Sequence, residues 1–179
     1  EGARVTGAKT ETAEYAGIIE TDNSNNSSGS LSREDFSVEG DNSGYTYVDG
    51  ILTFTEAGDY TVSMKSPGST TTVNRIVVDG SATGPFNITL DGVSIDASDK
   101  EGSAFALENE ATVNLILKGD NSLISKGNYA GLQVPEGTSV VIDAVDENGS
   151  LYAEANVNNS VLNAAGIGGV ARAKAGTIT

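Results

Sequence analysis

The larger part of the chain alternates apolar and polar positions in short runs, and this pattern predicts β-strands. From about residue 45 onward, an apolar side chain stands at every second position of each run, and Gly, Asp and Asn separate the runs. An alternation of period two is typical of strands with one buried face, and no segment sustains a helical period. The predicted strands are Ile51–Thr55, Tyr60–Met64, Arg75–Asp79, Phe86–Leu90, Val93–Ala97, Ala104–Glu108, Thr112–Leu117, Gly131–Val134, Ser139–Ala144 and Ser150–Ala155.

A repeat of about 27 residues relates these predicted strands to one another. In one register, steps of 26, 27 and 27 residues align Val62 with Ile88, Leu115 and Ile142. A second register has steps of 28, and a third has steps of 29 and 27. The second register comprises Ile95, Leu123 and Leu151. The third comprises Ile76, Phe105 and Leu132 and continues at Ile167.

Three registers in each repeat predict an all-β fold, a right-handed parallel β-helix with three strands per coil of about 27 residues. A single coil cannot enclose a core, so stacked coils share a continuous apolar interior. The right hand follows from the handedness of parallel crossover connections. A Greek-key sandwich is the structural alternative. Such a fold does not require a fixed repeat, so the regular spacing of the three registers argues against it.

The pattern divides the chain into two parts. Residues 45–179 form the expected β-helix domain, which we expect to be truncated at its C-terminal end because the strand-like Thr177–Thr179 closes the sequence. Residues 1–44 are expected to form an irregular N-terminal arm, cap or linker, since Thr21–Ser30 contains no apolar residue. Uncapped coil ends would allow self-association.

Composition excludes several classes of function. The chain has no His and no Cys, so it offers no histidine general base, no thiolate zinc site and no disulfide. Its 25 acidic and 10 basic residues give a formal charge of −15, which argues against nucleic acid as a partner. No apolar run is long enough to predict a membrane-spanning segment.

Four motifs resemble those of a known group of proteins. They are "NITLDGVSI" (Asn87–Ile95), "LKGDNSL" (Leu117–Leu123), "AGLQVPEGTSVVI" (Ala130–Ile142) and "AAGIGG" (Ala164–Gly169). The chain from about residue 45 resembles the β-helical surface proteins of bacteria, especially those of Gram-positive and gut species, some of which are described as carbohydrate-binding. The resemblance implies an extracellular location at the bacterial cell surface.

Two tyrosines are the candidate ligand-binding residues. Sugars stack on exposed aromatic rings, and this chain has no Trp. Tyr152 alternates with inward-facing Leu151 and Ala153 and so should face outward, while Tyr129 precedes a predicted strand at a corner of the coil. The alternative interpretation is that both rings merely cover coil edges.

One acidic turn is a candidate calcium site. Asp143, Asp146 and Glu147 lie within five residues of one another, and calcium takes six to eight oxygen ligands. The turn does not have EF-hand spacing. Its acids could equally cap local backbone groups. Apart from calcium, the sequence indicates no cofactor.

These observations favour a non-catalytic extracellular module for adhesion or carbohydrate recognition, with a polysaccharide or a host-surface glycan as its partner. The β-helix would be a rigid display scaffold. One alternative is a polysaccharide lyase or hydrolase, since β-helices also support such enzymes. We identify no catalytic residues. The position of Asp91 is occupied one repeat later by Lys118, so acidic residues do not stack on successive coils there. A second alternative is a structural stalk without a ligand.

Overall fold

The computed structural model describes residues 34–40, 43–66, 71–156 and 164–179. The chain divides into two units, residues 1–30 and residues 31–179, and every described residue belongs to the second. The polar tract Thr21–Ser30 therefore lies outside the described residues. Within these ranges the chain forms strands and no helix, which confirms the all-β prediction.

The strands form three sheets, here named A, B and C. Sheet A contains β1 (Phe36–Gly40), β4 (Asp59–Met64), β6 (Phe86–Asp91), β9 (Thr112–Lys118), β12 (Ser139–Ala144) and β15 (Thr177–Ile178). Sheet B contains β2 (Tyr45–Val48), β3 (Ile51–Phe54), β5 (Arg75–Asp79), β8 (Phe105–Glu108), β11 (Leu132–Gln133) and β14 (Ile167–Gly168). Sheet C contains β7 (Ser94–Ala97), β10 (Asp120–Lys126) and β13 (Ser150–Asn156).

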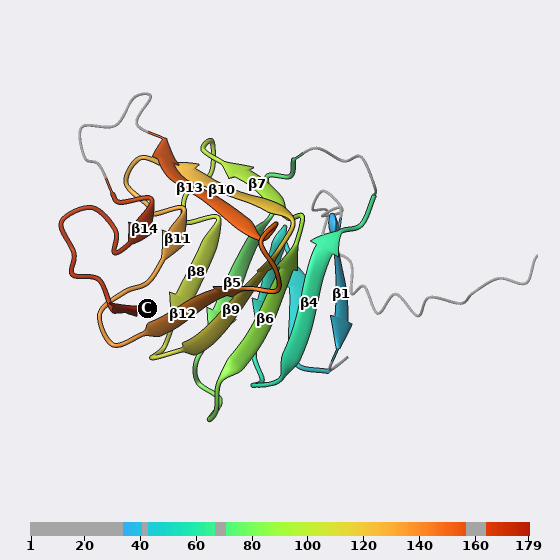
Figure 1. Ribbon diagram of the computed structural model, residues 1–179. Coiled ribbons are helices and arrows are strands. Elements are labelled where there is room, and N and C mark those ends of the chain that lie inside the picture. The colour runs from blue at the N-terminus through green and yellow to red at the C-terminus, as the bar shows by residue number, and fades with distance from the viewer. Residues whose placement is uncertain (1–33, 41–42, 67–70, 157–163) are drawn as a thin grey trace, which may run out of the picture. The chain divides into compact units, whose positions relative to one another are not determined.

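The chain visits the sheets in a fixed order, which confirms the parallel β-helix. From β5 to β13 each coil supplies one strand to sheet B, one to sheet A and one to sheet C, and β14 and β15 then add one strand to sheet B and one to sheet A. Each of these strands pairs in parallel with the equivalent strand of the next coil. Figure 1 shows β4, β6, β9 and β12 side by side across sheet A.

Among the described residues, two antiparallel strands flank the stack on its N-terminal side. In sheet A, β1 lies antiparallel to β4, and in sheet B, β2 lies antiparallel to β3. Strand β1 falls within residues 1–44, and its Phe36 is buried in the core. The Asp35 carboxylate accepts hydrogen bonds from the Thr72 hydroxyl at 2.6 Å and from the Asn74 amide at 2.9 Å. These contacts fasten β1 to the first coil.

The core is a continuous apolar column enclosed by the three sheets. Inward positions alternate with outward ones along each strand, as in β6, where every second residue is buried. Three phenylalanines, Phe54, Phe86 and Phe105, are completely buried. Burying a large apolar side chain contributes about 1.5–3 kcal/mol, so the column supplies most of the stabilisation of the coils.

The third predicted register is confirmed throughout, because Phe105 pairs with both Ile76 and Leu132, and Leu132 pairs with Ile167. The first register is confirmed from β6 to β12, where Leu115 pairs with Ile88 and Ile142.

Two steps of the predicted alignment are wrong by two residues. Ile88 pairs with Tyr60, and Val62 pairs with Leu90 instead. In sheet C, Leu123 pairs with Ile95 as predicted, but its other neighbour is Ala153 and not Leu151. A slip of two residues returns every side chain to the same face, so the apolar pattern alone does not detect it.

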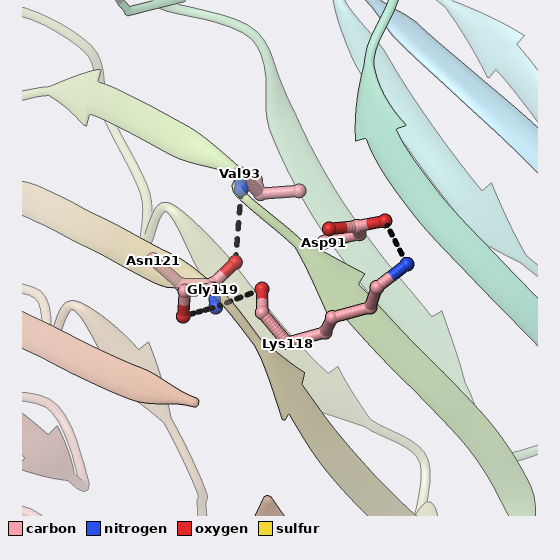
Figure 2. A network of polar contacts seen from close by, with 5 residues as sticks. All are labelled: Asp91, Val93, Lys118, Gly119 and Asn121. Atoms are coloured by element: carbon pink, nitrogen blue, oxygen red, sulfur yellow. Dashed lines mark hydrogen bonds and ion pairs between the residues drawn. The ribbon is translucent and has the colours of Figure 1, made fainter. Parts of the chain in front are cut away.

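A buried asparagine holds one corner of the helix together. Asn121 begins the inward face of β10 and is 3% exposed. Its side-chain oxygen accepts a hydrogen bond from the backbone N–H of Val93 at 2.8 Å. Its amide nitrogen lies 3.3, 3.1 and 3.2 Å from the carbonyl oxygens of Lys118, Gly119 and Ser150. Asn121 thus bridges three successive coils, and Figure 2 shows its contacts with Val93 and the Lys118–Gly119 turn.

Candidate functional site

A shallow groove on the outward face of sheet A is the candidate site. It has a volume of about 370 Å³ and lies across β1, β4, β6 and β9. Because side chains alternate across a strand, the polar residues of these strands collect on this outer face while the apolar ones enter the core. The groove is lined by Glu39, Gly40, Asp59, Tyr60, Thr61, Asn87, Thr89 and Ile116.

A column of polar side chains begins in the groove and continues along the outward face of sheet A to the next coil, beyond the groove lining. The strand registers place Asn87 between Asp59 and Asn114. The Asn87 amide nitrogen donates to an Asp59 carboxylate oxygen at 2.7 Å, and the Asn114 amide nitrogen donates to the Asn87 oxygen at 2.7 Å. An amide side chain both donates and accepts, whereas a carboxylate only accepts, so the column has a direction and ends on Asp59.

An ion pair lies on the same face of sheet A. Asp91 and Lys118 are register neighbours in β6 and β9, and their charged atoms are 2.8 Å apart. The hydrogen bond from Lys118 to Asp91, and the negative charge of Asp91, raise the pKa of Lys118 above its usual value. Figure 2 shows the pair beside the turn that leads into β10. The break in the acidic column noted in the sequence is therefore an ion pair between coils.

This face is suited to ligands that are rich in hydroxyl groups. Carboxylate and amide oxygens accept hydrogen bonds from hydroxyls, and amide nitrogens donate to them. Each amide nitrogen carries two hydrogens, and the column uses one of them at Asn87 and one at Asn114. Successive rungs of the column are about 4.8 Å apart, the spacing of paired strands. The surface can therefore offer the same contact repeatedly along one direction.

Tyr129 lies at the corner between β10 and β11, where its backbone N–H donates to the Lys126 carbonyl at 2.8 Å. The ring is half-buried, and its hydroxyl donates to Glu101 at 3.3 Å. Glu101 also forms an ion pair with Lys126. The hydrogen bond from Lys126 and its positive charge lower the pKa of Glu101.

Tyr152 faces outward from β13, as the alternation predicts, and is 57% exposed. Its hydroxyl donates to a Glu154 carboxylate oxygen at 2.6 Å, and this hydrogen bond and the charge of Glu154 raise the pKa of Tyr152. The described contacts of Tyr152 and Tyr129 involve different carboxylates, and neither ring lines the groove on sheet A. A ligand-binding role for either tyrosine stays a prediction.

The acidic segment at the end of β12 and in the turn that follows it is exposed. One Asp143 oxygen accepts a hydrogen bond from the Ala144 backbone N–H at 2.8 Å, and one Asp146 oxygen accepts one from the Asn148 N–H at 2.8 Å. Glu147 is exposed beside them. In the part of the chain that the structure describes, no group of three or more acidic residues is arranged to hold a metal ion. The calcium site at these residues stays a prediction.

The polar column on sheet A was not among the sequence predictions. A signal for it was present, because Asn87 and Asn114 are 27 residues apart, the same step that relates Ile88 to Leu115. Asp59 lies 28 residues before Asn87. Because this step is one residue longer than the next, the spacing did not align Asp59 with the two asparagines.

Comparisons with known proteins give no family for the chain: no family model matches it, and no curated protein or solved structure matches it either. Among the described residues, no helix has the length and apolar character needed to cross a membrane.

Proposed function

We propose that this β-helix is a non-catalytic module that recognises carbohydrate or mediates adhesion, and that the groove on sheet A is its contact surface. The observation that carries the proposal is the column formed by Asp59, Asn87 and Asn114. Its side chains are held by strand pairing and by one another before any ligand binds. Binding therefore requires little loss of side-chain freedom.

The groove favours a polymeric ligand. It is shallow and crosses several strands, and its contacts repeat from coil to coil. A polysaccharide presents the same hydroxyl groups at regular intervals, so consecutive sugar units can contact consecutive rungs. Thr61 and Thr89, which also line the groove and are register neighbours, add a second row of hydroxyl groups.

We also propose that the module works outside the cell, at a bacterial surface. The support is the resemblance of its repeats to bacterial surface proteins together with its strongly acidic, cysteine-free composition. A polysaccharide or a host-surface glycan is the expected partner. The parallel β-helix, which the structure shows, provides a rigid support for such a contact surface.

Removal of the two amide side chains of the column is expected to weaken glycan binding. The test applies the whole chain and the double variant Asn87→Ala, Asn114→Ala to a glycan array and measures affinity for the best glycans. Loss of two to three hydrogen bonds should weaken binding at least about tenfold. Ser122→Ala, on sheet C, is the matched control and should bind like the unaltered protein.

Three results would contradict the proposal. Unchanged affinity of the double variant would show that the groove is not the contact surface. Failure of the unaltered protein to bind any glycan would favour a structural stalk. New reducing ends or unsaturated products after incubation with pectins and xylans would show an enzyme.

A further inference from the structure

A second pocket lies at a different corner of the helix, where the strands of sheet B begin. It has a volume of about 170 Å³ and is formed by successive coils. The backbone N–H of Arg75 donates to the Gly50 carbonyl at 2.8 Å, which aligns the corner of one coil with that of the next. The pocket is lined by Asp49, Gly50, Ile51, Val73, Asn74, Arg75, Lys100 and Glu101.

The Arg75 side chain is seated at this corner by a glycine. Gly102 has a φ of +112°, and a Cβ at this position would collide with the guanidinium of Arg75. The backbone carbonyl of the next residue, Ser103, accepts a hydrogen bond from Arg75 Nη1 at 3.5 Å. A side chain at residue 102 would displace the guanidinium, so the glycine keeps Arg75 half-buried in the wall of the pocket.

The charges around the pocket favour a single negative charge inside it. Two cations, Arg75 and Lys100, and two anions, Asp49 and Glu101, line it. Glu101 is already paired with Lys126, whereas neither Arg75 nor Lys100 forms an ion pair with another described residue. Leaving that pair aside, the lining carries one excess positive charge, in a chain whose formal charge is −15.

We propose that this pocket binds the carboxylate of a small organic acid. The guanidinium of Arg75 presents paired N–H groups that match the two oxygens of a carboxylate, and Lys100 adds a second positive charge. The carboxylate of Asp49, which also lines the pocket, disfavours a second negative charge on the ligand, so a carboxylate is preferred over a phosphate dianion. This pocket is separate from the groove on sheet A, because the two share no lining residue.

The experiment is an NMR titration of the ¹⁵N-labelled protein with sodium acetate at constant ionic strength. The amide signals of Gly102 and Ser103 should shift and saturate with acetate, and sodium chloride should not shift them. Inorganic phosphate should bind more weakly than acetate. Lys100→Gln, which alters an exposed side chain, and Arg75→Gln should each raise the dissociation constant at least about tenfold.

Lys174→Gln is the matched control, since Lys174 is exposed and pairs with Glu136 in a later coil. It should titrate like the unaltered protein. Shifts that grow linearly without saturation would overturn the proposal. So would an unchanged dissociation constant in Lys100→Gln, or tighter binding of phosphate than of acetate.

Discussion

Replacement of Leu115 by aspartate is expected to unfold the stacked coils. Leu115 is completely buried in β9, and its register neighbours on the two adjacent coils are Ile88 and Ile142. Truncating a buried leucine costs about 2–5 kcal/mol, and an unpaired buried carboxylate adds a further penalty. A loss above about 5 kcal/mol takes up most of the stability of an ordinary domain. Circular dichroism and thermal melting of Leu115→Asp measure this loss directly.

Val141→Asp is the matched control for this experiment. Val141 is 46% exposed on the outward face of β12, where its neighbour in β9 is Asn114. The same substitution there should change the free energy of unfolding by about 1 kcal/mol or less. If Leu115→Asp melted as cooperatively and at the same temperature as Val141→Asp, the stacked apolar column would be refuted.

The second large effect is expected at Asn121. Replacing it with leucine removes the acceptor for the Val93 N–H and the donor to three backbone carbonyls. A buried backbone group left without a partner costs about 1–3 kcal/mol, so Asn121→Leu should lower the free energy of unfolding by about 3 kcal/mol. Urea denaturation measures the change. Asn148→Leu, in an exposed turn, should have little effect.

Asn121→Asp separates hydrogen bonding from side-chain volume. The new carboxylate keeps the acceptor for Val93 but faces the carbonyl oxygens of Lys118, Gly119 and Ser150, which repel its charge. Repulsion and burial raise the pKa of such a group in the folded state. Relative to the unaltered protein, the penalty of Asn121→Asp should therefore be smallest at pH values below the unfolded pKa of aspartate, about 3.9. The penalty should grow as the pH rises through the raised folded pKa. A penalty that is the same at every pH would contradict this account.

Much of the fold could be predicted from the sequence because apolar residues recur at equivalent positions of each repeat. Ile76, Phe105 and Leu132 occupy equivalent positions whatever the turns between them, so their spacing shows the stacking. The errors arose where turn lengths change. Tyr60 and Val62 are both apolar and face the same side, so only the connection lengths could decide which one pairs with Ile88.

The polar residues were harder to predict, because their roles depend on neighbours in other coils. The sequence does not distinguish Asn121, a buried bridge, from Asn114, a half-buried rung on the outer face, until the direction of each side chain is known. Arg75 and Lys100 meet at a corner made by connections of unequal length, so no regular step relates them. Tyr152 was oriented correctly because it lies within a regular strand.

The antiparallel strands β1 and β2 interrupt the parallel pairing of the stack on its N-terminal side. Within the stack, by contrast, β6 and β9 have like neighbours and are related by a constant step of 27 residues. An extra copy of residues 86–112, inserted after residue 112, would add one full winding and lengthen the body by about 4.8 Å. It would also add another asparagine rung. Duplication of a single repeat can thus lengthen the β-helix by one coil at a time while the apolar core positions stay the same.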